Sequence, residues 1–264
     1  MKINHKESFE EFGNQFTYYD QIDVNDYWGG MEIFLDQLYP FQPRVIKEKT
    51  IMEVGVGNGR VLKHLLKFKP KKIVAVDPAK SIYIAKNNNK SKKIDFVNIK
   101  GEDIKYKSKF DFVFSLGVIH HIPNYEIVCE NIYKSLKKKG KFVCWLYGKE
   151  GNEMYLLIFN NLRRITILIP DPILRIICHI LNIICYLYIF LCKFLPLPMK
   201  DYMLKIFKKC SYKKRNLMIF DQLNPSFAKY FKKQEVEYLM EKSGFKKIQL
   251  VHRHKYSWTV IAEK

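Results

Sequence analysis

The chain has 264 residues, which is too short for several large domains. Because 48% of them are hydrophobic, the chain can bury a full core and is not expected to be disordered. Its formal net charge is +20, from 46 basic and 26 acidic residues. A basic surface for nucleic acid or anionic lipid would give such a balance, and so would lysine-rich usage throughout. Because lysine occurs almost everywhere in the sequence, we favour the compositional explanation for most of the chain.

The cysteines and the N-terminus indicate a reducing compartment. No two cysteines form a C-x-x-C pair, none has a histidine at metal-ligand spacing, and three lie in one apolar segment. This is the usage of buried thiols rather than of a disulfide framework or a zinc site, so we expect no bound metal. The N-terminal stretch has no apolar signal segment, so the cytoplasm is the expected location.

Residues 1–48 precede the first predicted strand. They contain an aromatic stretch, FGNQFTYYD, at residues 12–20, and apolar residues at helical spacing over residues 28–38. Pro40 and Pro43 end that helix. An aromatic-rich segment at this place could simply cover the edge of a sheet.

A glycine turn follows the first strand. Residues 50–54 are an apolar, partly β-branched run typical of a buried parallel strand, and Gly55, Gly57 and Gly59 come at alternate positions before a helical pattern. Such a turn lets backbone N–H groups approach a nucleotide-like ligand, although it could also be a plain tight connection. The spacing is not the G-x-G-x-x-G of dinucleotide folds. Glu53 at the strand end would repel a pyrophosphate but suits an ammonium or sulfonium group.

The stretch from Glu53 to Gly59 reads E-x-G-x-G-x-G, which resembles motif I of the class I S-adenosylmethionine-dependent methyltransferases. The resemblance implies S-adenosylmethionine as the cofactor, with Glu53 and the three glycines in its site. The stretch at residues 12–20 is similar to the FGxxW-T opening of this family, with Phe16 where tryptophan is more usual. That similarity implies a lid over the cofactor, with Tyr18 and Tyr19 as lid residues.

The next two strands also end in acidic residues. Residues 72–76 form the second predicted strand and lead to Asp77, which could accept hydrogen bonds from ribose hydroxyls, cap the next helix ahead of a proline, or do both. The third predicted strand, residues 95–99, is followed by Glu102 and Asp103. The family resemblance implies that one of these two contacts the adenine amino group, and the sequence does not choose between them.

A second motif, KFDFVFSLGVIHHIP at residues 109–123, closely resembles motif IV of the ubiquinone/menaquinone-type branch. Its strand leads to Ser115, then to His120 and His121. A turn at residues 137–141 and a strand at residues 142–146 complete an alternating series, which predicts a parallel sheet with right-handed crossovers. Ligands bind at the carboxyl ends of such strands, where the acidic residues and Ser115 all lie.

His120 and His121 are the candidate catalytic bases. Methyl transfer needs a base only when the acceptor is a hydroxyl or a protonated amine, and these imidazoles follow the fourth strand on the substrate side of the crevice. In the resembling branch, such histidines commonly position the next segment without taking a proton, so both roles stay open.

Residues 151–215 form a basic, hydrophobic insertion, with 11 basic and 3 acidic residues. Residues 176–192 carry no charged side chain, and cysteines recur there every seven residues on one helix face. A single membrane span would separate the last strands from their sheet, so we reject spanning. The segment is either a buried helix of a cap or an element at an anionic membrane surface.

Residues 216–264 predict a closing helix and two strands, the last inserted antiparallel. The expected fold is therefore α/β, a Rossmann-like seven-stranded methyltransferase sheet with helices on both faces and a helical insertion. Residues 1–48 are the lid segment, residues 49–150 the cofactor-binding core, residues 151–215 the insertion and residues 216–264 the closing part of the core.

These features predict transfer of a methyl group from S-adenosylmethionine to a small-molecule, sugar or lipid-linked acceptor. Methylation of an isoprenoid quinone at the membrane surface and non-catalytic cofactor binding are the alternatives. Nucleic acid is not an expected partner, because no C-x-x-C or N-P-P-Y type signature is present. The protein would be cytoplasmic, with a peripheral position on the inner face of the membrane as an option.

Overall fold

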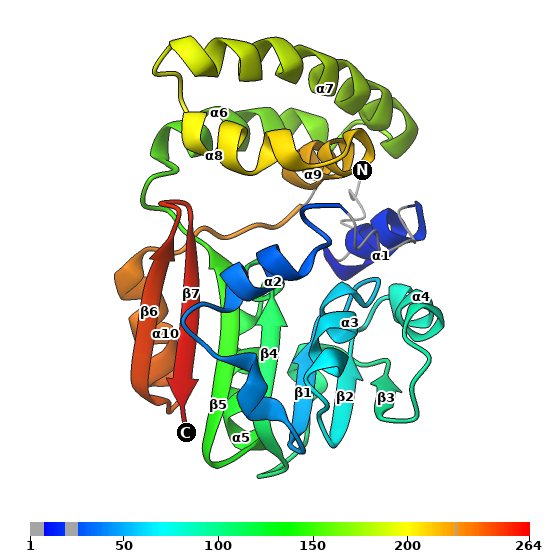
Figure 1. The fold of residues 1–264 in the computed structure, drawn as a ribbon, viewed down its shortest axis with the longest axis vertical. Helices are drawn as coiled ribbons and strands as arrows, with labels where there is room; N and C mark the ends of the chain where they lie inside the picture. The colour runs from blue at the N-terminus through cyan, green and yellow to red at the C-terminus, as the bar shows by residue number, and fades with distance from the viewer. Residues whose placement is uncertain (1–7, 19–25, 225) are drawn as a thin grey trace, which may run out of the picture.

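A seven-stranded sheet lies beneath a layer of helices in this computed structural model, which describes residues 8–18, 26–224 and 226–264 (Figure 1). The strands are β1 Thr50–Val54, β2 Lys72–Val76, β3 Ile94–Val97, β4 Phe110–Leu116, β5 Leu136–Tyr147, β6 Lys246–Arg253 and β7 Ser257–Glu263. Their order in the sheet is β3-β2-β1-β4-β5-β7-β6, and β7 runs antiparallel to both of its neighbours. The predicted Rossmann-like methyltransferase sheet with an antiparallel last strand is confirmed.

The α-helices come in two groups. Those that accompany the sheet are α1 Ser8–Tyr18, α2 Met31–Leu38, α3 Arg60–Lys67, α4 Ser81–Asn88, α5 Tyr125–Ser135 and α10 Lys233–Lys242. Those in the layer above the strand ends are α6 Glu153–Thr166, α7 Asp171–Phe194, α8 Lys200–Lys205 and α9 Tyr212–Leu223. We call α1 the lid and α6 to α9 the cap.

Both faces of the sheet are buried, which explains the nearly continuous apolar runs of its central strands. Ile51 of β1 and Ile73 of β2 pack with α2, α3 and α4, whereas Met52 and Val74 point to the other face and pack with α5 and α10. Successive side chains of a strand alternate between faces, so a strand covered on both sides needs apolar residues at every position. Each such side chain contributes about 1.5–3 kcal/mol on burial.

The lysine-rich segment at residues 137–141, which we expected to be a turn before the fifth strand, is part of β5. The pairing of β4 with β5 shifts register between Phe110 and Phe112, and Lys139 has a left-handed backbone with φ of 63°. The backbone N–H of Lys139 donates to the carbonyl of Lys264 at 2.9 Å. A bulge therefore keeps this segment hydrogen-bonded to the sheet, which composition alone did not indicate.

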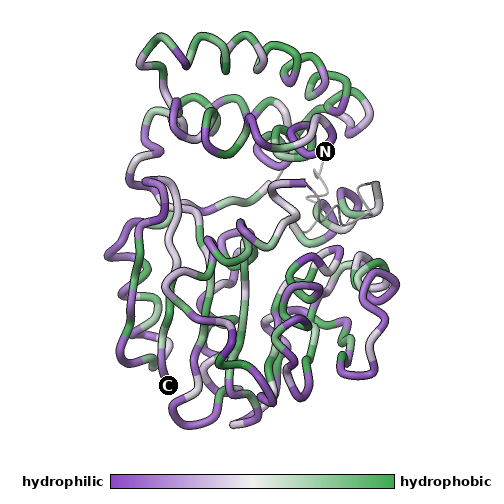
Figure 2. The backbone as a smooth tube through the Cα atoms, in the orientation of Figure 1, coloured by the Kyte–Doolittle hydropathy of each residue, from purple (hydrophilic) through white to green (hydrophobic). Residues whose placement is uncertain are grey.

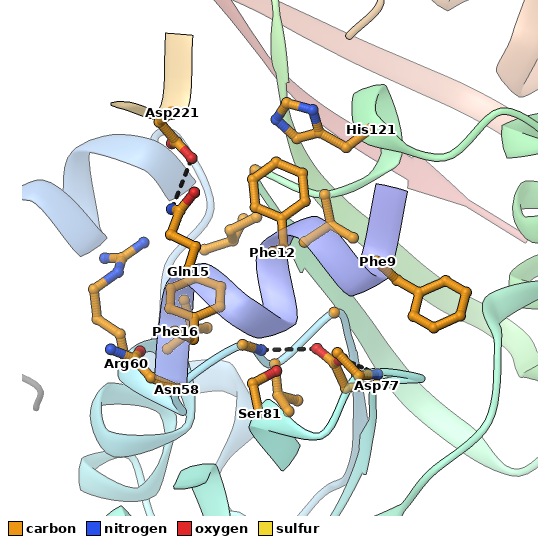
Figure 3. A pocket seen from close by; sticks show the side chains of 18 of the residues that line it. Phe9, Phe12, Gln15, Phe16, Asn58, Arg60, Asp77, Ser81, His121 and Asp221 are labelled. Carbon is orange, nitrogen blue, oxygen red and sulfur yellow. Dashed lines mark hydrogen bonds between the residues drawn. The ribbon is translucent and has the colours of Figure 1, made fainter. Parts of the chain in front are cut away.

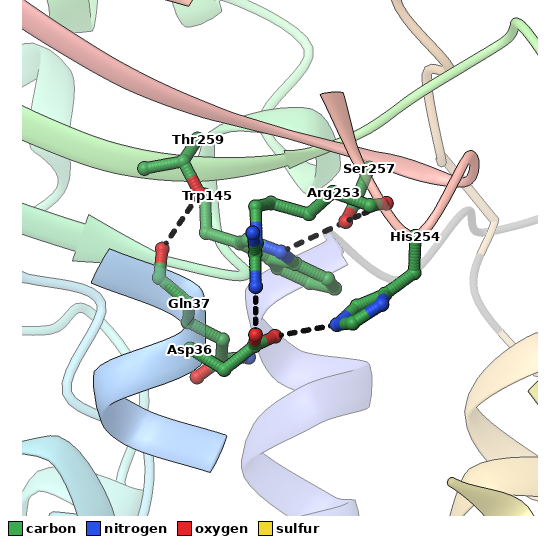
Figure 4. Close-up of polar contacts among 7 residues, drawn as sticks. All are labelled: Asp36, Gln37, Trp145, Arg253, His254, Ser257 and Thr259. Atoms are coloured by element: carbon green, nitrogen blue, oxygen red, sulfur yellow. Dashed lines mark hydrogen bonds and ion pairs between the residues drawn. The ribbon is translucent and has the colours of Figure 1, made fainter. Parts of the chain in front are cut away.

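Polar contacts fix α2 against the C-terminal hairpin (Figure 4). Asp36 accepts hydrogen bonds from Arg253 and from Nε2 of His254, the latter at 3.0 Å. The hydroxyl of Thr259 donates to the backbone carbonyl of Gln37 at 2.9 Å. The segment before the first strand is therefore built into the sheet's surface by residues more than 200 positions away.

The cap is held together around α7 and α9. Leu174 and Cys178 of α7 pack with Phe220 and Leu223 of α9, and further along α7 a second cluster joins it to α8. Asn182, which is fully buried, donates to the carbonyl of Tyr212 and to Oδ1 of Asn216 of α9. Among the described residues, α7 is the one helix long and apolar enough to cross a membrane.

Candidate functional site

A cavity of about 850 Å³ lies at the carboxyl ends of β1, β2 and β4. The glycine turn after β1 forms its floor, the lid covers it, and side chains of α9 in the cap line the far wall (Figure 3). Its volume is near the upper end of the ~300–1,000 Å³ range of small-molecule sites. The cavity therefore has room for a cofactor and for the group that reacts with it.

The glycine turn lies directly beneath the lid. Gly57 has a φ of 53°, and a Cβ atom placed on it would come within 2.8 Å of the ring of Phe16. The backbone N–H of Gly57 donates to Oδ2 of Asp77 at 2.8 Å, which ties the turn to the end of β2 (Figure 3). Only glycine combines this left-handed backbone with so close an approach of the lid.

Glu53 supplies a buried carboxylate at the cavity floor. Its side chain is 2% exposed, and Oε2 has no hydrogen-bond partner within the described structure. Burial raises the pKa of Glu53 well above its usual range, Arg60 opposes this shift, and Asp77 adds to it. A buried carboxylate with an unpartnered oxygen, on a residue that lines the cavity, fits a ligand that brings an ammonium or sulfonium group.

Asp77 has acceptor capacity left for a second ligand group. Its Oδ1 accepts from the N–H of Ala79 at 2.9 Å, and its Oδ2 accepts from Gly57. Burial raises the pKa of Asp77 to about 6, although these backbone hydrogen bonds lower it. A carboxylate offers about four lone-pair positions, so acceptor capacity remains for a ribose hydroxyl. The structure does not make Asp77 the helix cap, since α4 begins four residues later at Ser81.

The other proposed cofactor residues divide into two groups. Gly55 and Glu102 line the cavity, whereas Asp103 is exposed and does not. Ser115 is fully buried away from the cavity lining, and its hydroxyl donates to the carbonyl of Val54 at 3.0 Å. Gly59 is also outside the lining, and its carbonyl accepts from the amide of Asn89 at 3.0 Å. Ser115 and Gly59 therefore hydrogen-bond within the protein and do not line the cavity.

The two histidines have different surroundings. His121 lines the cavity, and its Nδ1 lies 3.1 Å from the carbonyl of Phe227, so this nitrogen is the donor and Nε2 is left as an acceptor. Burial lowers the pKa of His121 to about 4, so the ring is neutral near pH 7. His120 is fully buried behind it, stacked on Tyr147 with 3.8 Å between ring centroids. Of the two candidate bases, only His121 reaches the cavity.

Sequence reasoning missed the residues by which the lid and cap close the cavity. The side-chain amide of Gln15 donates to Oδ1 of Asp221 at 2.8 Å, joining the lid to α9 (Figure 3). Lys214 of α9 lies over the ring of Trp28 at 5.5 Å, and burial lowers its pKa to about 8. The string DQLNP contains Asp221, but nothing local in it points to the lid 206 positions earlier.

Three phenylalanines of the lid line the cavity, whereas the two proposed lid tyrosines are not tested by the structure. Tyr19 and the side chain of Tyr18 lie outside the described residues. Phe9, Phe12 and Phe16 line the cavity instead, and the ring of Phe12 lies 4.5 Å from that of His121. The lid helix therefore presents aromatic side chains to the cavity.

Comparison with known proteins identifies the core. Residues 52–144 match the family described as Methyltransferase domain. A tRNA U34 carboxymethyltransferase of Helicobacter pylori is 34% identical over 105 residues, which are 37% of this chain and 40% of that protein. The chain therefore spans about 40% of the length of the curated relatives it matches, and others of them carry the same name.

Solved structures share the fold at low sequence identity. A SAM-dependent methyltransferase of Thermotoga maritima superposes with a TM-score of 0.55 at 16% identity, over 97% of this chain and 99% of that one. The 1,6-didemethyltoxoflavin-N1-methyltransferase of Burkholderia thailandensis, solved with S-adenosylhomocysteine, gives 0.53 at 13% identity, over 96% and 87% of the two chains. The family match over residues 52–144 confirms the predicted methyltransferase domain, whose expected cofactor is S-adenosylmethionine, and these two structures share its fold.

The expected partners need correction. We expected a small-molecule or lipid-linked acceptor, with an anionic membrane surface as an option, and set nucleic acid aside, whereas the curated relatives are named for a tRNA acceptor. Nucleic acid was set aside because the sequence has no N-P-P-Y or C-x-x-C signature. Those signatures belong to particular acceptor sites, whereas the cofactor-binding core serves many acceptors, so their absence did not exclude RNA.

Proposed function

We propose that this chain, which carries a class I S-adenosylmethionine-dependent methyltransferase domain, transfers a methyl group to a nucleoside of RNA, with tRNA as the acceptor to test first. The observation that carries the proposal is the similarity to tRNA U34 carboxymethyltransferases. The net charge of +20 supports it, because phosphate backbones attract lysine-rich surfaces without regard to sequence.

The cofactor's sulfonium supplies an activated methyl group. The protein therefore has to hold the cofactor, align the acceptor atom with the methyl carbon and exclude water from the site. Glu53 would take the ammonium of the methionine part, Asp77 the ribose hydroxyls and Glu102 the adenine amino group. Phe16 would cover the bound cofactor from above. This assignment uses the unpartnered oxygen of Glu53 and the open lone pairs of Asp77.

The acceptor part of the cavity suits a flat ring. Phe12, His121, Trp28 and Tyr147 line it, and aromatic side chains stack on nucleobases with about 1–3 kcal/mol per base. Nε2 of His121 could accept a hydrogen bond from the acceptor group, and take its proton where that group is a hydroxyl or an amine. An enzyme that modifies a base inside a folded RNA must first expose that base to such a pocket.

A carboxymethyl group is the second candidate for transfer, as the names of the relatives state for those proteins. The observation that favours it is Lys214, whose ammonium lies over Trp28 and which lines the same cavity as Glu53. A lysine there could hold a carboxylate on the group being transferred. Mass spectrometry of the modified nucleoside separates the two products directly.

The test is to incubate the purified protein with S-adenosylmethionine labelled in its methyl group and with unmodified tRNA, and to digest the tRNA to nucleosides. The proposal predicts label in one nucleoside, weaker transfer at higher salt, and none with Asp77→Ala. A matched control is Asp95→Ala, whose carboxylate sits on β3 in an exposed ion pair with Lys72. Labelling of lipid or small-molecule extracts instead of tRNA would overturn it.

We place the protein in the cytoplasm. All six cysteines are free thiols, five of them buried, as a reducing compartment allows. Fractionation of cells that express a tagged copy tests this placement, which recovery of the protein outside the cytoplasm would contradict.

A further inference from the structure

The outward face of α7 is the largest apolar feature that the cofactor site does not use. Figure 1 places α7 at the outer edge of the cap, and Figure 2 shows hydrophobic residues along it. Its inward face packs on α8 and α9 through the buried residues Leu174, Cys178, Ile189 and Cys192. Nothing in the described structure covers the opposite face.

Seven exposed residues on that face follow a strict pattern, and we call them the outer seam. They are Ile173, Ile176, Ile180, Ile183, Leu187, Phe190 and Phe194, each between 52% and 70% exposed. Their spacing alternates between three and four residues over three heptads. This is the a/d repeat by which one α-helix packs against another helix along its length. A lipid surface needs an apolar face but no such repeat.

The order of residue sizes along the outer seam favours an antiparallel partner of the same sequence. The first four residues are isoleucines, and the last three are a leucine and two phenylalanines. When two copies pair antiparallel about the middle of the helix, the isoleucines at the start of one helix face the phenylalanines at the end of the other, so that larger side chains meet smaller ones at both ends of the contact. A parallel pair would place Phe190 and Phe194 against themselves and leave small against small at the other end.

Charge and area agree with this arrangement. An antiparallel pair brings the end with Asp171 beside the partner's end with Lys193, and it opposes the two helix dipoles. Each residue of the outer seam exposes roughly 100 Å² of apolar surface, which gives roughly 700 Å² per copy. Ile184 and Tyr186, each about half exposed, widen the contact. A standard interface buries about 800 Å² on each partner.

We propose that α7 pairs with α7 of a second copy of this chain, antiparallel, through the outer seam. The dimer is isologous, with its two-fold axis close to Ile183 near the middle of the helix. Because α9 packs on the inward face of α7 and also lines the cavity, pairing holds the cap of each copy from outside.

The first test measures the mass of the full chain in solution by sedimentation equilibrium. We expect a dimer whose dissociation constant rises on the order of 1,000-fold with Ile183→Glu, since this change places two carboxylates at the axis. Ile165→Glu is the matched control, because Ile165 of α6 is 64% exposed but lies outside the outer seam. Unchanged thermal unfolding of each variant shows that it is folded. A monomeric wild type, or a dimer that survives Ile183→Glu, would overturn the proposal.

The second test fixes the orientation. Ile183→Cys should form a disulfide-linked dimer on mild oxidation, whereas Ile173→Cys should not, because antiparallel pairing leaves the two Ile173 positions about 30 Å apart. The wild type is the control, since its α7 cysteines face inward. Flotation with phosphatidylglycerol vesicles is run alongside. A monomer that floats and loses binding with Ile183→Glu would assign the outer seam to lipid and overturn the dimer.

Discussion

Gln15 of the lid donates a hydrogen bond to Asp221 of the cap at 2.8 Å, and this contact closes the cavity over the cofactor-binding turn. The two residues are 206 positions apart; Gln15 is buried and Asp221 is partly buried. Two further bonds join the lid to the segment that follows α9, because Glu11 accepts from the backbone N–H and from the hydroxyl of Ser226. The lid therefore depends on the cap as well as on the sheet.

Breaking the bond between Gln15 and Asp221 should open the lid. Gln15→Met keeps the length of the side chain but removes the donor, and a hydrogen bond to a charged group contributes about 1.5–3 kcal/mol. We expect the dissociation constant for S-adenosylmethionine to rise roughly 10- to 100-fold. Thr17→Val is the control, since the hydroxyl of Thr17 bonds within the lid, to Gly13. An equal loss of affinity in both variants would show that the contact with α9 is not what closes the site.

Gly57 should not tolerate even one methyl group. In Gly57→Ala, the left-handed backbone conformation costs about 1–2 kcal/mol in stability. The new Cβ would also lie only 2.8 Å from the ring of Phe16. Gly117→Ala carries the same backbone cost, with φ of 81°, but its Cβ would find only Trp145, at 3.8 Å. Calorimetric titration should show cofactor binding lost in Gly57→Ala and retained in Gly117→Ala, at similar thermal stability. Retained binding in both variants would remove Phe16 from the site.

His121 should make the fold sensitive to acid. The pKa of His121 in the folded protein, about 4, lies below the ordinary 6.5. The contribution of the neutral ring to the free energy of unfolding is therefore fully present above pH 6.5 and is lost as the pH falls towards 4. This difference between the folded and ordinary pKa values corresponds to about 3 kcal/mol in the free energy of unfolding. Urea unfolding at pH 7.5 and 4.5 should therefore show a smaller acid loss in His121→Gln, which keeps a donor for the carbonyl of Phe227. Parallel pH curves for the two proteins would contradict a neutral, buried His121.

The same pKa bears on catalysis. If His121 takes a proton from the acceptor, kcat/KM should stay level from pH 8 down to pH 5 in wild type, without the inflection near pH 6.5 of an exposed histidine. An inflection near pH 6 that disappears in Asp77→Asn would instead report the carboxyl of Asp77, whose pKa is raised to about 6 by burial.

The parallel sheet and the cofactor side of the cavity could be predicted from sequence because their signals are local. A buried strand, a glycine turn and a helix follow one another within residues 50–67, and strand ends in a parallel sheet meet at one edge. Glu53, Gly57 and Asp77 therefore line the same cavity, as expected. Their ligand roles remain predictions until a complex is measured.

The acceptor side could not be predicted, because its residues come from distant segments. Gln15, Trp28 and Lys214 meet in the cavity only through the packing of lid, sheet and cap. The basic, apolar composition of residues 151–215 indicated an unusual surface, but it did not say which face of α7 would be covered. The sequence also did not indicate that the hydroxyl of Ser115, at the end of β4, donates to the carbonyl of Val54 in the neighbouring strand.

The most direct test of this account is calorimetric titration of the purified protein with S-adenosylmethionine, beside NAD and beside Gly57→Arg. The site described here predicts binding of S-adenosylmethionine with one site per chain, no binding of NAD, and loss of binding in the variant, where the longer side chain would displace the lid. Binding of NAD instead, or binding of S-adenosylmethionine that Gly57→Arg leaves intact, would contradict the assignment of this cavity.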